Sequence, residues 1–431
     1  STEYKDFEDG QHYLSLSKTE RDMIDLVCSN FDNVVLVYNA ANTLELGFVD
    51  EHPQIKSVIW CPGTGQTGFN ALGEIVAGEV NPSGHTTATF AANSLSAPSA
   101  ENFGLHAYNY GSKTPRAAGD SFVSYNEGIY VGYRYYETRY EDTILGQGNA
   151  DSAVGTKAST DGWNYAEEVC FPFGYGLSYT TFEQTLDNLN VDLENETVTA
   201  NVTVKNTGSV AGKDVVQLYV SLPYTDYDKE HGVEKAAIQL LDYGKTAELA
   251  LGASETVTIT ADMQNMASWD STADNAAGTK GCYILDAGDY WFTIGNGAHE
   301  AVNNVLAAEG QSVDGSADKA KSWTLDSFDD TTFATTKNGT AVENQLADMD
   351  INSWLPGTAT YMTRSDWEGT FPKAPAFEDL AKDEAWLKNL DMPAMTMVFK
   401  VKETAWLDTL KAGMKIRFQA ETIDGALTIV R

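Results

Sequence analysis

The stretch Glu127-Gly128-Ile129-Tyr130-Val131-Gly132-Tyr133-Arg134-Tyr135-Tyr136 is followed later in the chain by Phe171-Pro172-Phe173-Gly174-Tyr175-Gly176-Leu177-Ser178-Tyr179-Thr180. Both stretches interleave aromatic residues with glycines at fixed offsets. Glycines permit tight turns, and aromatic side chains bury large apolar surfaces. We therefore expect Tyr133, Tyr135 and Tyr136 to pack into the core beside a sheet.

Upstream of these stretches, helix and strand patterns alternate. Ser17-Lys18-Thr19-Glu20 has the spacing of a capping box, in which the serine hydroxyl and the glutamate carboxylate each accept a backbone N–H. A helix should begin there, followed by β-branched strands at 33–38 and 55–60. Repeated strand–helix units predict a mainly parallel sheet covered by helices.

Downstream, short strands follow one another. Residues 198–205 and 214–220 alternate inward and outward around the turn Asn206-Thr207-Gly208, which predicts a β-hairpin. Further strands at 254–259 and 288–294 predict an immunoglobulin-like β-sandwich. The predicted fold class is therefore α/β plus all-β: an α/β sandwich domain, then a β-sandwich, then a small β-rich tail.

Composition limits the partners. The chain has 431 residues, a formal net charge of -34 and 42% hydrophobic residues, which suits ordinary packed domains. The acidic balance argues against nucleic acid and anionic membranes as partners. No apolar run approaches the roughly 20 residues that span a bilayer, so the chain is expected to be soluble, in a cytoplasmic or extracytoplasmic compartment. The four cysteines are widely spaced and are expected to be free thiols.

Charge is distributed unevenly along the chain. Residues 372–431 hold nine acidic and nine basic residues, so the whole net charge belongs to residues 1–371. This break indicates a tail of different origin. We expect four regions, listed by residue number: an α/β sandwich domain at 1–180, a β-sandwich at 181–300, an irregular linker or domain-packing segment at 301–376, and a β-rich tail at 377–431.

The segment Gly63-Thr64-Gly65-Gln66-Thr67-Gly68 matches the glycine spacing of a dinucleotide-binding loop. Such a site also needs an acidic residue about 20 positions later to bind the ribose. Residues 80–100 contain no Asp or Glu. The sequence therefore disfavours a dinucleotide enzyme.

Three ordered segments instead resemble the second domain of glycoside hydrolase family 3, the β-glucosidase-like enzymes. These segments are 60–68, 81–84 and 127–136, and residues 206–220 resemble the fibronectin-III-like domain of the same family. The resemblance implies a glycosidase acting on β-linked glucosides or short oligosaccharides, without a cofactor for hydrolysis. It also implies that the fibronectin-III-like domain supports the structure rather than the chemistry.

Trp60 and Tyr125 are the candidates for lining a sugar site, because an aromatic face can stack on a pyranose ring. Glu127 and Arg134 are expected to form a partly buried ion pair rather than to act as catalysts.

A retaining glycosidase needs two carboxylates about 5 to 5.5 Å apart. In family 3 the nucleophilic aspartate follows a barrel strand in a serine-aspartate-tryptophan motif. Ser365-Asp366-Trp367 reproduces these residues, but Arg364 precedes them and a loop-like stretch follows, which is unsuited to a barrel strand. No (β/α)8 barrel of roughly 250 residues fits on either side. We therefore do not assign Asp366 as the nucleophile.

The family's acid/base glutamate lies in a Gly-Glu-Gly motif before the helix that begins here near Ser17. Residues 1–13 lack this motif, and Glu3 and Glu8 match it poorly. The chain therefore resembles the inverted domain order of the family, cut at both ends. The catalytic residues stay unassigned, and a barrel domain in another chain or a removed segment should supply the nucleophile. The alternative is a non-catalytic carbohydrate-binding or scaffolding module, and the chain alone is expected to be inactive.

Residues 390–401 resemble the metal loop of small periplasmic copper-chaperone β-barrels, and residues 410–418 resemble the strand after it. Met395 and Met397 would share one side of a strand, and thioethers are soft ligands suited to Cu(I). Met392 stands at the usual aromatic position, and the half of such a domain that carries the histidine is missing. The alternative interpretations are that these methionines pack in a core or stand at incidental surface positions.

Overall fold

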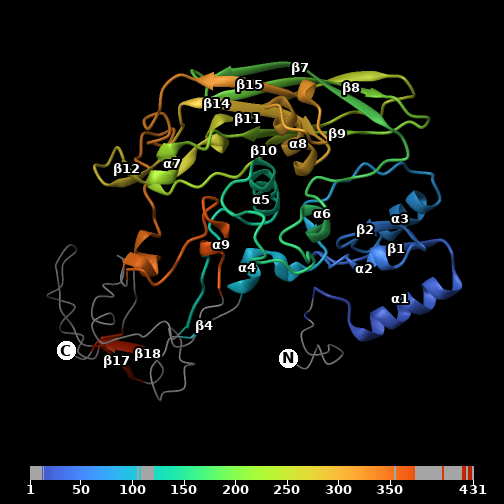
Figure 1. The fold of residues 1–431 in the computed structure, drawn as a ribbon, viewed down its shortest axis with the longest axis horizontal. Coiled ribbons are helices and arrows are strands. Elements are labelled where there is room, and N and C mark those ends of the chain that lie inside the picture. The colour runs from blue at the N-terminus through green and yellow to red at the C-terminus, as the bar shows by residue number, and fades with distance from the viewer. Residues whose placement is uncertain are drawn as a thin grey trace.

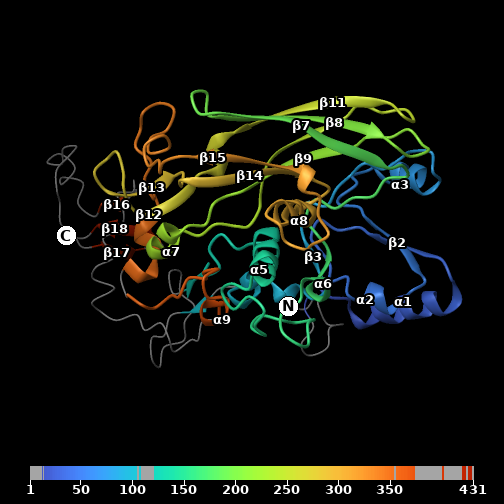
Figure 2. The ribbon, with the colours of Figure 1, turned by 45° about the horizontal axis from the view of Figure 1, so that its top comes forward.

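The computed structural model describes residues 12, 14–103, 106–107, 121–353, 356–373, 400–401, 420–423 and 426–429. These residues form an α/β part followed by a two-layered β part (Figures 1 and 2). The predicted combination of α/β and β-sandwich architecture is thereby confirmed.

The α/β part is built on a two-stranded parallel sheet. Helix α1, Lys18–Asn30, begins with the predicted capping box, in which the Ser17 N–H donates to the Glu20 carboxylate at 2.9 Å. Strands β1, Val34–Tyr38, and β2, Ile55–Trp60, run parallel and in contact. The helix start and both strands were therefore predicted correctly.

Within the described chain, one face of this sheet is covered. Leu36 and Val58 point to that face and pack against buried side chains of α1 and of α2, Phe48–Glu51. Val35 and Val37 point to the opposite face and are 49% and 38% exposed. Parallel sheets are usually buried on both faces, so this second face is open in an unusual way.

Short elements complete the α/β part, and β3 pairs with β6 and β4 with β5, both antiparallel. Their bounds are α3 Phe69–Val76, β3 Phe90–Ala91, α4 Pro98–Glu101, β4 His106–Ala107, β5 Ser121–Phe122, α5 Tyr133–Leu145, α6 Tyr165–Glu168 and β6 Val169–Phe171. In α5, Tyr135 and Tyr136 are buried as predicted. Tyr133 is partly buried and stacks on Phe173, with ring centroids 4.5 Å apart.

The β part is a sandwich of two sheets with strand orders β11-β8-β7 and β10-β9-β14-β15. The strands are β7 Phe182–Asp192, β8 Thr197–Asn206, β9 Val215–Ser221, β10 Gln239–Lys245, β11 Ser254–Asp262, β14 Gly288–Gly295 and β15 Ala320–Leu325. Val202, Leu218 and Phe292 meet between the sheets and are fully buried. Burial of this apolar surface is the main favourable term in the folding of such a layer.

The predicted hairpin between β8 and β9 is wrong. β8 pairs with β7 and β11, whereas β9 pairs with β10 and β14 in the other sheet. The Asn206 side chain accepts from the Thr180 hydroxyl at 2.8 Å and donates to the Leu249 carbonyl at 2.9 Å, which redirects the chain after β8. Both strands have alternating apolar residues because each contributes to the same interlayer core.

The remaining elements are short. They are α7 Asp226–His231, β12 Ser268–Asp274, β13 Lys280–Ile284, α8 Ala298–Ala308, α9 Trp367–Thr370, β16 Lys400–Val401, β17 Ala420–Ile423 and β18 Ala426–Ile429. Of these, α7 and β12 lie at one end of the sandwich, whereas α8 lies against the sheet that contains β9 and β14 (Figure 1). The four region boundaries proposed from the sequence stay proposals. β15 extends the sandwich past residue 300 because it pairs with β14 as an edge strand. Among the helices of the described residues, none has the length and apolar character needed to cross a bilayer.

The two parts are packed against each other through α5 and α8. Val302 of α8 is buried beside the partly buried Tyr133 and Tyr140 of α5. The Tyr140 hydroxyl donates to Asn303 Oδ1 at 2.8 Å, and His299 Nδ1 lies 2.8 Å from a carboxylate oxygen of α5. This contact between the parts combines apolar burial with partly buried polar pairs.

Candidate functional site

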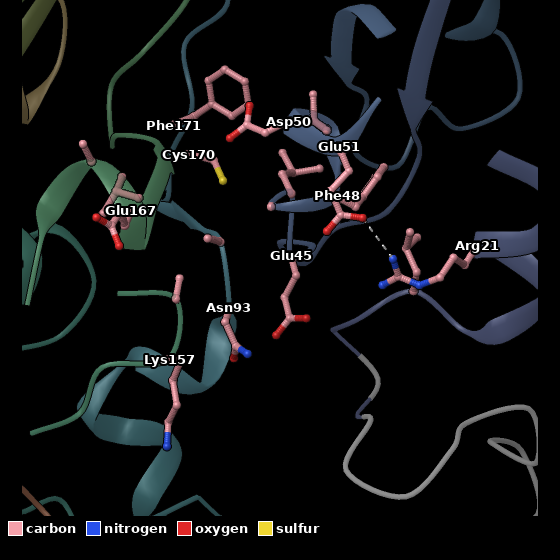
Figure 3. A pocket seen from close by; sticks show the side chains of 18 residues that line it. Arg21, Glu45, Phe48, Asp50, Glu51, Asn93, Lys157, Glu167, Cys170 and Phe171 are labelled. Atoms are coloured by element: carbon pink, nitrogen blue, oxygen red, sulfur yellow. Dashed lines mark ion pairs between the residues drawn. The ribbon is translucent and has the colours of Figure 1, made fainter. Parts of the chain in front are cut away.

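A cleft of about 610 Å³ opens in the α/β part. Residues 45–51 form one wall, and residues 157–158 and 166–171 form the other (Figure 3). Arg21, from the start of α1, and Asn93, from the loop after β3, complete the lining. The cleft therefore lies where α1, α2 and α6 approach one another.

Charged groups of both signs face this cleft. Glu45 Oε1 accepts from the Ser94 backbone N–H at 2.8 Å and lies 2.8 Å from His12 Nε2. Arg21 Nη1 lies 3.8 Å from a carboxylate oxygen of Glu51. The lining thus offers hydrogen-bond donors and acceptors together, as a hydroxyl-rich neutral ligand requires.

Cys170 also lines the cleft. Burial, helped by the nearby Asp50 carboxylate, raises the pKa of the Cys170 thiol to about 11. Since the thiolate is the reactive form, this cysteine is a protonated packing group near neutral pH rather than a nucleophile.

Trp60, a predicted sugar-stacking residue, lies at the end of β2 outside the cleft lining. Its indole N–H donates to the Ala40 carbonyl at 2.9 Å, and its ring meets Phe90 edge-on with centroids 5.2 Å apart. These contacts place one side of the indole in the α/β core. The stacking role of Trp60 stays a proposal.

Tyr125, the second predicted sugar-stacking residue, lies in the loop between β5 and α5 and is 71% exposed. It is also outside the cleft lining, so the cleft does not bring Trp60 and Tyr125 together. Nearby, Glu127 is 3% exposed and accepts from the Asn102 amide at 3.2 Å. Among the ion pairs of the described residues, Glu127 is not joined to Arg134.

The serine-aspartate-tryptophan motif has a structural role, because it caps a helix and packs against α5. Asp366 caps α9 by accepting from the Gly369 N–H at 3.0 Å, and Trp367 is fully buried with its indole N–H 2.9 Å from Asp142 Oδ2. Arg364 is 4% exposed and pairs with Asp142 and with Glu141. The segment therefore fixes the chain against α5, with Asp366 engaged in capping α9.

Met392, Met395 and Met397, the predicted copper ligands, lie outside the described residues. Within the described ranges, no group of three or more His, Cys, Asp or Glu side chains could hold a metal ion.

The cleft residues Arg21, Glu45, Asn93 and Lys157 were not singled out from the sequence. They come from four separate segments, and no local spacing links them. The only early signal was the aromatic and glycine stretch at 171–180, because its first residue, Phe171, ends β6 and lines the cleft.

Family comparisons agree with this architecture. Residues 2–133 match the glycosyl hydrolase family 3 C-terminal domain, and residues 214–298 match the fibronectin type III-like domain. Residues 384–431 match the copper binding periplasmic protein CusF.

Curated relatives are similar over about two thirds of this chain. The chain is 34% identical to β-glucosidase A of Butyrivibrio fibrisolvens over 310 residues, which are 69% of this chain and 32% of that protein. It is 30% identical to a β-glucosidase of Ruminococcus albus over 66% of this chain and 25% of the relative. The chain thus spans about a third or less of the length of these relatives.

Solved structures of β-glucosidases also resemble this chain over part of their length. A β-glucosidase from Paenibacillus barengoltzii shares 27% identity with a TM-score of 0.54, covering 78% of this chain and 33% of that one. β-Glucosidase 3B from Thermotoga neapolitana shares the fold with 24% identity and a TM-score of 0.51, over 73% of this chain and 35% of that one. The chain therefore combines a domain similar to the C-terminal domain of glycosyl hydrolase family 3 with a fibronectin type III-like domain, as in β-glucosidases.

Proposed function

We propose that this chain is the α/β and fibronectin-III-like portion of a β-glycosidase that hydrolyses β-linked glucosides or short oligosaccharides. The observation that carries the proposal is the similarity to β-glucosidase A of B. fibrisolvens over 310 residues, at 34% identity and across both parts of the described fold.

The chemistry we propose is the retaining two-carboxylate mechanism. One carboxylate attacks the anomeric carbon while a second protonates the leaving oxygen, and water later releases the sugar. The nucleophile would come from a barrel domain outside this chain. Asp366 and Glu127 support this division, since the first caps a helix and the second is buried in a hydrogen bond.

The test uses two chains. The full chain is assayed on aryl β-glucosides alone and after mixing with the separately produced part of β-glucosidase A that this chain does not match. We expect turnover only in the mixture that contains both chains. Robust turnover by this chain alone would overturn the assignment of the nucleophile to another segment, and no turnover in the mixture would count against the glycosidase assignment.

A non-catalytic carbohydrate-binding role is the second candidate. The mixed donor and acceptor lining of the cleft favours it, together with the apolar rings of Phe48 and Phe171 that line the same space. Glucose-oligomer binding by the isolated chain, weakened at least about tenfold by Asn93→Ala or Arg21→Ala, would support this role. Binding unaffected by either change would place the sugar elsewhere, with Trp60 and Tyr125 as the next candidates.

We further propose that the tail binds Cu(I) through Met395 and Met397, with Met392 beside them. The match of residues 384–431 to a copper binding protein supports this. Thioether sulfur prefers Cu(I) over Zn(II), so a competition titration against a Cu(I) chelator should show uptake. The Met395→Ala, Met397→Ala double variant should lose it, and equal uptake by both proteins would leave these methionines as packing residues.

A further inference from the structure

A buried lysine lies with two buried aspartates at the end of the β-sandwich that holds α7 (Figure 1). Lys235 precedes β10, Asp228 belongs to α7, and Asp286 follows β13. These residues, which we call the lysine triad, are 2%, 0% and 2% exposed. Lysine and aspartate are almost never buried to this extent unless they are paired, so their contacts decide what the site can do.

The ammonium nitrogen of the triad lies close to both carboxylates. Lys235 Nζ donates to Asp286 Oδ2 and, at 3.0 Å, to the Pro223 carbonyl. Asp228 Oδ1 lies 2.8 Å from the same nitrogen, in a direction that gives no hydrogen bond, and has no other partner among the described residues. Asp228 Oδ2 accepts from the Thr225 backbone N–H at 2.6 Å, which fixes this carboxylate at the start of α7. The amine therefore touches one carboxylate, and a second, fixed carboxylate lies within reach of its protons.

The triad lies among side chains that exclude water. Ile284 and Leu285, which precede Asp286 in the chain, are each 1% exposed. The Tyr290 hydroxyl donates to the Asp286 carbonyl at 3.0 Å and holds the turn before β14. Burial raises the pKa of the Asp286 carboxyl above its ordinary value, although the Lys235 charge opposes this shift. An environment of low polarity favours the neutral amine and the neutral acid, which are the forms that can react with each other.

We propose that Lys235 and Asp286 join through a spontaneous isopeptide bond, which makes the triad a self-modification site. The Lys235 amine attacks Asp286 Cγ, a C–N bond forms, and the bond from Cγ to one carboxylate oxygen breaks. That oxygen takes up two protons of the original ammonium, one of them by way of Asp228, and leaves as water. One ammonium and one carboxylate become a neutral amide, and Asp228 returns to its carboxylate form.

Two features favour this condensation inside the fold. Reacting groups that are held in contact can reach effective concentrations of about 10⁵ to 10⁸ M. A buried ion pair must also compensate for the lost hydration of two charges, whereas the amide product carries no charge.

An exposed pair of the same residue types gives an internal control. Lys280 Nζ lies 2.6 Å from Asp274 Oδ1, but these side chains are 63% and 83% exposed. Water keeps both groups hydrated and charged, so this pair should stay unlinked although its two charged atoms are close. Burial, rather than proximity alone, should therefore select Lys235 and Asp286.

Intact-mass spectrometry of the denatured full chain tests the bond. We expect a mass below that of the sequence by one water molecule, and a linked pair of peptides that contain Lys235 and Asp286 after proteolysis. Lys235→Arg and Asp286→Ala should each restore the full mass, because a guanidinium stays protonated and alanine has no carboxyl group. Asp228→Asn keeps both reacting groups and should slow formation of the bond at least about tenfold, since it removes the proton acceptor. The control Lys280→Arg should leave the loss of water unchanged.

Three outcomes would overturn the proposal. The full sequence mass in the unaltered chain, after days in the folded state, would leave the triad as an ion pair. A lost water that is regained in mild alkali would indicate a succinimide at an Asp-Gly pair such as Asp161-Gly162, because an isopeptide bond survives that treatment. Equal cross-linking of Lys280 to Asp274 would show that burial does not select the reacting pair. All three measurements use the unaltered chain, so they do not depend on whether a variant folds.

Discussion

Arg364 joins two regions of the chain through buried charge. Its guanidinium is 4% exposed, pairs with Glu141 and Asp142 on α5, donates to the Lys235 carbonyl at 3.2 Å and lies 4.9 Å from the Tyr224 ring centre. A guanidinium suits this site because its fork of donors can bind several acceptors at once.

Arg364→Met should therefore lower the free energy of unfolding by about 3–5 kcal/mol, because it leaves two buried carboxylates without a cation. Chemical denaturation measures the change. The control is Lys337→Met, which breaks an exposed pair with Asp262 and should cost less than about 1 kcal/mol. Similar losses for the two variants would show that the Arg364 site is accessible to water in solution.

Cys170 gives a prediction that depends on pH. Burial raises its pKa to about 11, above the ordinary value, so the folded protein holds less thiolate at every lower pH than an exposed cysteine would. At about pH 8 roughly one thiol in a thousand is ionised, and alkylation should be slow. Its rate should rise about tenfold per pH unit until the pKa is reached.

Iodoacetamide labelling followed by peptide mass spectrometry measures this rate, with Cys170→Ser identifying the peptide. Fast labelling of Cys170 near neutral pH would mean that the cleft wall is open or that its thiol is activated.

Contacts between residues close in the sequence could be predicted from the sequence, whereas contacts between distant residues could not. Ser17 and Glu20 predicted their own hydrogen bonds because the partners are three residues apart. The burial of Arg364 depends on carboxylates more than 200 positions away. The sequence showed that an arginine is unsuited to a barrel strand, but it held no sign of where the charge would be neutralised.

At the scale of elements, the β1–β2 sheet has a covered face and an open face. Val35→Thr alters the open face and should change the free energy of unfolding by less than about 0.5 kcal/mol. Val58→Thr alters the covered face, where the hydroxyl loses water, and should cost about 1–3 kcal/mol. Thermal and urea denaturation of the full chain compare the two. Equal costs would indicate that another surface covers Val35 in solution.

Strand positions were easier to predict than strand partners. The residues of β1, β2, β8, β9, β11 and β14 follow from alternation and β-branched content, which depend on near neighbours. Whether β8 pairs with β9 depends on which sheet each strand joins, and both have the same alternating pattern. The cleft residues Glu45 and Lys157 were missed for a related reason, since the packing of α1, α2 and α6 brings them together only in the folded chain.

At the scale of the whole molecule, the α/β part and the β-sandwich should unfold as one unit. Val302, Ala301 and Val305 of α8 are buried against α5, and the Ala237 N–H of the sandwich donates to Thr138 Oγ1 at 2.9 Å. Arg364 and Trp367 add a third connection from a distant segment. An interface that is both apolar and hydrogen-bonded couples the stabilities of the parts it joins.

Val302→Asp should uncouple them, because an unpaired carboxylate cannot remain in the apolar contact between α5 and α8 without a cost of several kcal/mol. Calorimetry of the unaltered chain should show one main unfolding transition for the two parts. The variant should instead show two transitions, with the α/β part unfolding at a lower temperature than the β-sandwich. Leu251→Asp, at a position 66% exposed, is the control and should keep the single transition. Tyr140→Phe removes only the hydrogen bond to Asn303 and should lower the transition slightly without splitting it. Two transitions already present in the unaltered chain would contradict the coupling, since the α5–α8 contact would then be too weak to join the two parts.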